Sequence, residues 1–90
     1  MASQFDPKKD AANIRKHGIS LTEADGVTDD PFVLTKEDSF AEGEQRFVAL
    51  GRNFFGQLRV LVYTYRGEDN RAISVRRPDS KEIRNYEEGI

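Results

Sequence analysis

Two adjacent arginines near the end of the chain are the first candidates for chemistry. They are Arg76 and Arg77, which close the stretch RAISVRR just before Pro78. A guanidinium group stays charged and holds a phosphate group through two parallel hydrogen bonds. Because consecutive strand residues point to opposite faces, the two side chains cannot both decorate one exposed surface. The pair is either solubilising charge at a strand end or a contact for a negatively charged ligand.

The other reactive side chains are those that metal-free cleavage of RNA would require. Such cleavage needs a base for the 2′-hydroxyl proton, cations that stabilise the phosphate, and an acid for the leaving 5′-oxygen. Arginine suits the second task, but it is a poor proton carrier because it stays protonated. If the chain performs this chemistry, the candidate phosphate ligands are Arg46, Arg76 and Arg77. The candidate proton carriers are Glu44, Tyr63, Tyr65, Tyr86 and the single histidine, His17.

Each of these side chains also has a purely structural interpretation. Glu44 and Arg46 are spaced as a same-face strand pair, and such exposed pairs contribute only about 0.2–1 kcal/mol. Tyr63 suits the edge of a sheet core, since tyrosine has an apolar body and a polar tip. Tyr86 has the helical spacing of a packing residue. His17 stands where the C-terminal end of a helix favours a basic residue.

The formal net charge of −2 hides a segregation of charge along the chain. Residues 25–45 hold seven carboxylates against one lysine, whereas residues 46–77 hold seven arginines against two carboxylates. Phosphate responds to the local field, so an acidic total does not exclude a nucleic-acid ligand. The alternative is that the arginines keep an exposed strand face soluble.

Missing residue types narrow the function classes further. The chain has no cysteine and one histidine, which excludes disulfides and thiolate metal sites and argues against zinc. The acidic segment lacks calcium-loop spacing, and neither a glycine-rich phosphate loop nor a serine nucleophile elbow is present. The sequence has neither a signal-peptide pattern nor a long apolar run. We therefore expect a cytoplasmic protein with no membrane contact, no metal and no cofactor.

The first helix is marked by its capping residues. Asp6 followed by Pro7 predicts the start, and the segment KHG predicts an end at Gly18. The helical spacing places Ala11 and Ile14 on the face that packs against the core.

Two later capping boxes predict two more helices. Ser20 and Glu23 form an S-x-x-E box for a short helix that ends near Gly26. Asp79 and Glu82 form the second box, for a C-terminal helix. One face of that last helix carries Ile83, Tyr86 and Ile90.

The middle of the chain predicts an antiparallel sheet. Apolar and alternating runs at 45–51, 57–66 and 70–77 are separated by short connections that contain glycine, and a shorter run lies at 32–35. The fold class is therefore α+β: a small antiparallel sheet of three to four strands, N-terminal helices and a C-terminal helix, in one domain spanning 1–90.

Alternation along the strands predicts two different sheet faces. The apolar face, which should carry the helices, consists of Phe47, Ala49, Leu58, Val60, Val62, Ile73 and Val75. The other face should be partly open and able to hold a ligand or partner, and it consists of Arg46, Val48, Leu50, Arg59, Leu61, Tyr63, Tyr65, Ala72, Ser74 and Arg76. Arg77 falls in the apolar register but can curl out past Pro78.

Several segments together resemble one known family. They are FDPKKDAANIRKHGIS, DDPFVLT, GEQRFVALG, GQLRVLVYTYRG, AISVRR and RNYEE, in this order. In order and spacing they look like BrnT, the ribonuclease toxin of bacterial BrnT–BrnA toxin–antitoxin pairs, over nearly the whole chain. BrnT proteins are similar in fold to RelE-type toxins, whose helices pack on one side of a small antiparallel sheet.

The resemblance implies a ribonuclease that halts translation and is held inactive by a BrnA-like antitoxin. That antitoxin dimerises through a ribbon-helix-helix module, so only the toxin–antitoxin assembly would bind operator DNA. RelE-like sites act without a metal. Matching positions support His17, Glu44, Arg46, Tyr63 and Arg76 as site residues, and the RelE-like arrangement adds Arg77 and Tyr86 more loosely. The alternative function is a non-catalytic module whose open sheet face binds RNA or a protein.

Two positions depart from the family pattern. Pro78 directly follows the strand arginines and could redirect Arg77. Arg59 stands where the family more often has an aliphatic residue, so Arg59 is left out of the predicted site.

Overall fold

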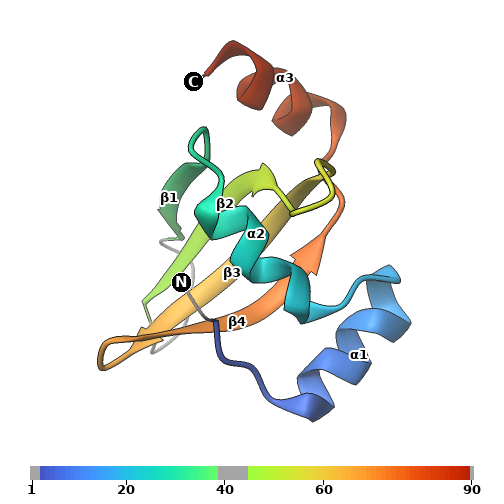
Figure 1. The fold of residues 1–90 in the computed structure, drawn as a ribbon, viewed down its shortest axis with the longest axis vertical. Helices are drawn as coiled ribbons and strands as arrows, with labels where there is room; N and C mark the ends of the chain where they lie inside the picture. Colours follow the sequence, from blue (N-terminus) through green and yellow to red (C-terminus); the bar gives the residue numbers. More distant parts are fainter. Residues whose placement is uncertain (1–2, 39–44, 90) are drawn as a thin grey trace.

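A four-stranded antiparallel sheet forms the centre of the fold (Figure 1). The computed structural model describes residues 3–38 and 45–89, so one predicted site residue, Glu44, lies outside the described residues. The strands are β1 (Leu34–Asp38), β2 (Arg46–Arg52), β3 (Leu58–Arg66) and β4 (Asp69–Arg76), and they pair in that order. The predicted α+β class is confirmed, with four strands. The short strand expected at 32–35 is shifted along the chain to β1.

The helices are α1 (Pro7–His17), a 3₁₀ helix η1 (Leu21–Glu23), α2 (Ala24–Asp29) and α3 (Ser80–Glu88). In Figure 1, α2 crosses one face of the sheet, α1 lies beside β4, and α3 lies at the opposite end of the molecule. Within residues 3–38 and 45–89, no helix combines the length and apolarity needed to cross a membrane.

The predicted caps of the first and last helices are present. The Asp6 side chain accepts a hydrogen bond from the backbone N of Lys8, and Gly18 ends α1 in the left-handed conformation that the C-cap requires. In α3 both hydrogen bonds of the Asp79–Glu82 capping box are formed. These ends are local features, because each depends on residues only a few positions apart.

The expected box at Ser20 and Glu23 is only half formed. Ser20 accepts from the backbone N of Thr22, but the Glu23 carboxylate instead accepts from Arg59 Nε at 2.8 Å and from Asn53 Nδ2 at 2.7 Å. The buried Arg59 is thereby paired, which explains a guanidinium at a position that the family pattern gives to an aliphatic residue. The helical segment also continues to Asp29, past the expected end near Gly26.

The core lies on both faces of the sheet. The larger cluster lies between the sheet and segment 19–29, which contains η1 and α2, and it consists of Ile19, Leu21, Ala24, Val27, Ala49, Leu61, Tyr63, Ala72 and Val75. A smaller cluster on the other face consists of Leu50, Val60 and Tyr86, with Leu34, Val48 and Leu58 packed against it. Since Tyr86 belongs to α3, this helix covers part of the second face.

The predicted division of strand residues between the two faces is wrong for β3. The register pairs Phe47 with Tyr63 and Ala49 with Leu61, so these residues share the face that α2 covers. Alternation fixes the two sides of one strand but not the match between strands. Because Val60 and Leu61 are both fully buried, β3 is apolar on both sides and its pattern does not tell them apart.

A β-bulge makes the prediction wrong for β4 as well. Val62 pairs with Ser74 while Tyr63 pairs with Ala72, so Ile73 is an extra residue in β4. Ala72 and Val75 consequently both lie in the larger core cluster, although their spacing in a regular strand would place them on opposite faces. Ile73, which was assigned to the apolar face, is only half-buried.

The outer edge of β4 is closed by residues from the N-terminal part of the chain. The backbone of Gln4 donates to Asn70 O at 2.9 Å and accepts from Ala72 N at 2.8 Å. Beyond the bulge, the buried Asn13 side chain pairs with the edge backbone. It donates to Val75 O at 2.9 Å and accepts from Val75 N at 3.3 Å. The edge strand therefore has its outward backbone groups paired at these three positions.

Asn13 is also the residue of α1 that faces the sheet, which corrects a prediction. Ala11 and Ile14 were expected to face the core, but both are exposed. A third hydrogen bond, from Asn13 Nδ2 to Ile19 O at 2.8 Å, ties the helix to the segment that follows it. Polar contacts to the strand edge, rather than an apolar stripe, thus orient α1.

Candidate functional site

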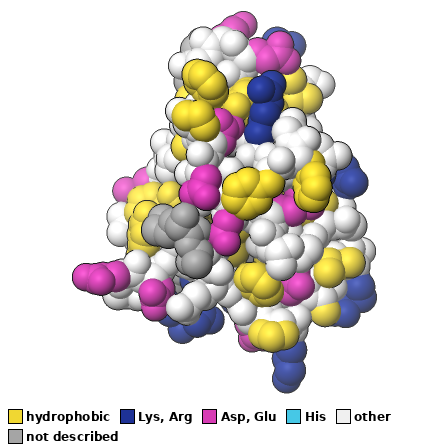
Figure 2. All heavy atoms as spheres, viewed as in Figure 1, with side chains coloured by type: hydrophobic (Ala, Val, Ile, Leu, Met, Phe, Trp, Pro, Cys, Tyr) yellow, Lys and Arg dark blue, Asp and Glu magenta, His cyan; other side chains and the backbone are white. Residues whose placement is uncertain are grey.

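A groove about 410 Å³ in volume lies between α1 and the edge strand β4. We call it the α1–β4 groove, and it is lined by Lys9, Ala12, Asn13, Lys16, His17, Ile73, Ser74 and Arg76. Two of the predicted site residues, His17 and Arg76, meet here although they are far apart in sequence. Lys and Arg side chains also gather in Figure 2 at the end of the molecule where Figure 1 places α1.

The helix contributes one of its faces to the groove. Lys9, Asn13, Lys16 and His17 follow the i, i+4, i+7, i+8 spacing of a single helical face. Asn13 holds this face against β4, so both lysines and the histidine project along the strand edge. The two lysines were missed from the sequence, although their spacing relative to Asn13 and His17 was visible there.

Arg77 lies next to His17 rather than pointing into the core. Its Nη1 donates to the backbone O of His17 at 2.8 Å, at the C-terminal end of α1. A cation is favourable at that end, because the last carbonyl groups of a helix carry partial negative charge. The two neighbouring arginines therefore point to different places, as strand alternation predicts: one side chain lines the groove and the other binds the end of the helix.

Arg76 forms a bidentate ion pair at the edge of the groove. Its Nη1 and Nη2 donate to the two carboxylate oxygens of Glu82 in α3, both at 2.9 Å. The hydrogen bonds that Arg76 donates to Glu82 raise the pKa of Arg76 and lower the pKa of Glu82. One Glu82 oxygen also accepts from the backbone N of Asp79 at 2.9 Å. A cation suited to phosphate is therefore already paired with a carboxylate.

Arg46 lies on the same sheet face as Arg76 but at a distance. Arg76 is in register with Val60 and Leu50, whereas Arg46 lies four residues away from Leu50 along β2. With about 4.8 Å between strands and about 3.4 Å per residue, the two arginine Cα atoms are about 17 Å apart. The two side chains therefore start from well-separated points of the sheet. Among the described residues, Arg46 Nε is buried and has no hydrogen-bond partner.

Tyr63 lies on the opposite face from Arg76, which corrects its predicted place on the open face. Its ring stacks on Phe47 with centroids 5.5 Å apart and meets Tyr65 edge to face at 5.7 Å. Burial, with a smaller effect of Tyr65, raises the pKa of the Tyr63 hydroxyl. Tyr65 is exposed, and its ring packs against Phe47 on the same sheet face as Tyr63.

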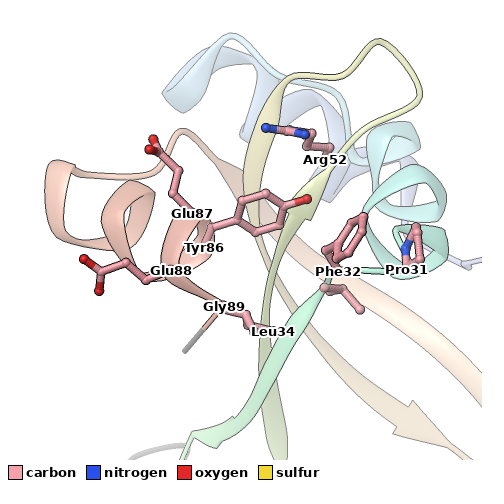
Figure 3. Close-up of a pocket in the computed structure, with 9 residues that line it drawn as sticks. Pro31, Phe32, Leu34, Arg52, Tyr86, Glu87, Glu88 and Gly89 are labelled. Atoms are coloured by element: carbon pink, nitrogen blue, oxygen red, sulfur yellow. The ribbon is translucent and has the colours of Figure 1, made fainter.

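Tyr86 is buried beneath the C-terminal end of α3, away from the α1–β4 groove. Its hydroxyl donates to Asp30 Oδ2 at 2.6 Å, and the guanidinium of Arg52 lies 5.1 Å from the centre of its ring (Figure 3). Burial and the hydrogen bond to Asp30 raise the pKa of the Tyr86 hydroxyl. Of the predicted proton carriers within the described residues, only His17 lines the same groove as Arg76.

Within residues 3–38 and 45–89, no three His, Cys, Asp or Glu side chains come together as a metal site would require. The α1–β4 groove presents cations instead, and these can meet an anionic ligand directly.

The architecture is that of a small α+β toxin of known structure. The 1.1 Å crystal structure of the Brucella abortus ribonuclease toxin BrnT superposes with a TM-score of 0.63 and 19% sequence identity. The match covers 89% of this chain and 99% of the other. At this identity the likeness establishes the fold. No curated protein gave a significant match to the chain.

The family follows from the sequence itself. Residues 5–82 match the model of a family described as the ribonuclease toxin, BrnT, of type II toxin–antitoxin systems. The chain therefore belongs to the BrnT family of ribonuclease toxins, as its sequence motifs predicted. Membership in a type II system also implies an antitoxin partner.

Proposed function

We propose that the chain cleaves RNA in the α1–β4 groove without a metal ion. The observation that carries the proposal is the meeting of a histidine, an arginine and two lysines along one groove of a BrnT-family fold. Cations stabilise the phosphate as negative charge develops on it, and histidine is the side chain best suited to carry protons near neutral pH.

The reaction follows from these roles. The 2′-oxygen of the substrate loses its proton and attacks the adjacent phosphorus, while the bond from phosphorus to the 5′-oxygen breaks. The 5′-oxygen takes up a proton, so the products are a 2′,3′-cyclic phosphate and a free 5′-hydroxyl. His17 carries one of these protons and Arg76 holds the phosphate oxygens, with Lys9 and Lys16 along the neighbouring phosphates.

The other predicted residues take different roles in the proposal. Arg77 supports the site by fixing the end of α1 at His17, since its guanidinium is bonded to that backbone. Arg46 contacts a different part of the RNA, because its Cα lies about 17 Å from that of Arg76 along the sheet. Tyr63 and Tyr86 pack the two faces of the sheet. Glu44 stays a candidate proton carrier by its sequence position alone.

The cellular role we propose is arrest of translation in the cytoplasm. A BrnA-type antitoxin, dimeric through a ribbon-helix-helix module, would neutralise the toxin, and only the complex would contact operator DNA. Family membership supports these statements.

The decisive test is cleavage of a labelled single-stranded RNA by the purified chain in the presence of EDTA. We expect cleavage with cyclic-phosphate ends, and we expect Arg76→Ala and His17→Ala each to lower the rate at least 100-fold. Arg84→Ala removes the same charge from an exposed position outside the groove and should keep the wild-type rate.

Two outcomes would contradict the proposal. Loss of wild-type activity in EDTA would show that a metal is required. Full activity in both groove variants, with their fold verified by urea unfolding, would move the active site elsewhere. RNA binding without any cleavage product would instead favour the alternative, a non-catalytic binding module.

A further inference from the structure

Three strongly exposed phenylalanine side chains lie just after α2 and just after β2. Phe32, Phe54 and Phe55 are 71%, 72% and 85% exposed. Solvent-exposed phenylalanines that are grouped in this way mark interaction surfaces more often than isolated ones do. On the face shown in Figure 2, hydrophobic side chains lie beside acidic ones over α2 and the region next to α3.

Two of these phenylalanines line adjoining hollows. Phe32 borders a hollow of about 570 Å³ between segment 31–34 and the C-terminal end of α3 (Figure 3). Phe54 borders a second one of about 320 Å³ between the end of α2 and the β2–β3 turn. Because Pro31 and Arg52 line both hollows, the two adjoin and make up one surface region. We call it the aromatic groove: Pro31 and Arg52 at its centre, Phe32 and Phe54 on its walls, Glu87 and Glu88 on its rim.

The centre of the aromatic groove is held by a hydrogen-bonded carboxylate. Asp30 Oδ2 accepts from Arg52 N at 2.8 Å and from the Tyr86 hydroxyl at 2.6 Å, while Oδ1 accepts from Phe32 N at 2.9 Å. These bonds connect the segment carrying Phe32 to β2 and to α3. A surface fixed in this way loses little conformational entropy when it binds a partner.

The Phe54 wall is fixed by a close approach of backbone. A Cβ atom at Gly26 would lie 2.5 Å from the backbone N of Phe54 and 2.8 Å from Asn53 Cα, so α2 touches the β2–β3 turn directly. The Asn53 carboxamide also accepts from the backbone N of Phe55 and of Gln57, both at 2.9 Å. The turn is thus held in one conformation, although its two phenylalanines are exposed.

Charge distinguishes the aromatic groove from the α1–β4 groove. Glu87 and Glu88 are exposed on its rim, and its guanidinium group, that of Arg52, lies against the Tyr86 ring. The two grooves share no lining residue. Carboxylates on the rim repel an RNA backbone and attract lysine or arginine. The chemistry fits a polypeptide with apolar side chains flanked by basic ones.

We propose that the aromatic groove docks such a basic and apolar segment of the antitoxin. The proposal rests on the antitoxin partner that family membership implies and that the proposed function includes. Apolar side chains of the antitoxin fill the space between Phe32 and Phe54, and its basic side chains meet Glu87 and Glu88. Buried aromatic anchors of this kind contribute most of the binding energy in protein interfaces.

The test measures binding of the purified antitoxin encoded beside the toxin gene to toxin variants by calorimetry. Phe32→Ser and Phe54→Ser should each raise the Kd at least tenfold. Phe55→Ser is the matched control, because Phe55 neighbours Phe54 and is more exposed but lines neither hollow; its Kd should stay within twofold of wild type. The double variant Glu87→Gln/Glu88→Gln should raise the Kd and flatten its dependence on salt.

Cleavage of RNA by the same variants separates this proposal from the proposed function. All of them should cleave RNA at the wild-type rate when the antitoxin is absent. Wild-type antitoxin affinity of both Phe32→Ser and Phe54→Ser, or no binding by the wild-type toxin, would overturn the docking site. Weaker RNA binding in these variants would show that the phenylalanines stack on bases, and would overturn it too. A wild-type toxin that binds antitoxin through Phe32 but cleaves no RNA would refute the proposed function alone.

Discussion

The ion pair between Arg76 and Glu82 makes the substitution Glu82→Gln informative. Glu82 accepts from Nη1 and Nη2 of Arg76, both at 2.9 Å, so its carboxylate competes with an RNA phosphate for this guanidinium. Glutamine keeps the size of the side chain and an oxygen that can accept from the backbone N of Asp79, since glutamine serves in a capping box as glutamate does. The substitution therefore removes the competing charge and keeps the helix start.

The size of the effect follows from how exposed the pair is. The side chains of Arg76 and Glu82 are 39% and 23% exposed, so solvent screens much of their attraction. A partly exposed pair of this kind is worth up to about 1 kcal/mol. Relief of that competition should lower the Kd for RNA about fivefold. The free energy of unfolding should fall by about 0.5–1 kcal/mol.

The dependence of the pair on pH has a definite sign. The hydrogen bond from Arg76 outweighs burial and holds the pKa of Glu82 below its ordinary value of 4.5. A lowered pKa stabilises the folded state above the unfolded-state value, and this stability is lost as the pH falls through the folded-state value. The stability difference between wild type and Glu82→Gln should accordingly be constant near pH 7 and shrink as the pH falls below 4.5.

The assay is fluorescence anisotropy with a single-stranded RNA whose 2′-hydroxyls are methylated, so that it binds without being cleaved. Glu88→Gln makes the same charge change on the same helix at an exposed site and controls for the net charge. Weaker RNA binding by Glu82→Gln than by this control would refute competition. It would mean that Glu82 orients Arg76 for the phosphate instead.

Two further predictions concern the contacts that hold the helices in place. Asn13→Ala should lower the free energy of unfolding by about 2–4 kcal/mol in urea titrations, because Val75 and Ile19 would lose partners for buried backbone groups; a loss under about 1 kcal/mol would show that water replaces the amide. Tyr86→Phe should cost about 1–2 kcal/mol at pH 7 by removing one hydrogen bond to the Asp30 carboxylate. Burial raises the pKa of Asp30, but hydrogen bonds, of which that from Tyr86 is the largest, outweigh it and lower this pKa from 3.8. The stability difference between wild type and Tyr86→Phe should therefore shrink below about pH 3.8. A stability difference that grows in acid would contradict this account.

The features that sequence predicted well are the local ones. The start of α1 at Asp6 and Pro7, its end at Gly18 and the capping box of α3 each depend on residues within one helical turn. The hydrophobic runs likewise identified the strands, because burial in a sheet selects β-branched and aromatic residues. The family resemblance rested on the order of these same segments and was confirmed over residues 5–82.

The errors arose where one element meets another. The face of β3 was wrong because this central strand is buried on both sides, so its alternation carries no information about which side faces α2. The bulge at Ile73 depends on the match between β3 and β4, which no local pattern announces. Asn13 was overlooked because its partners, Ile19 and Val75, lie 6 and 62 positions away from it in the chain.

For the same reason, the sequence predicted only part of how the candidate site residues are arranged in space. His17 and Arg76 come together only because Asn13 clamps α1 along the edge of β4, so sequence could propose both residues but not the groove between them. Tyr63 was assigned to this surface through the face error in β3, and it packs on the opposite side. Once Asn13 is known to face β4, helical spacing places Lys9 and Lys16 on the same face of α1.

The closed edge of β4 also constrains how the groove recognises RNA. Backbone groups of Asn70, Ala72 and Val75 are already bonded to Gln4 and Asn13, so a ligand cannot add to this edge as a further strand. The side-chain amide of Asn13 already donates to a backbone carbonyl, so it is not available to form a hydrogen bond with a base. What the described lining offers is mainly positive charge, which contacts phosphates regardless of sequence. Within the described lining, base edges could be contacted only by side chains such as Ser74 and the cations themselves, so we expect cleavage with little sequence preference.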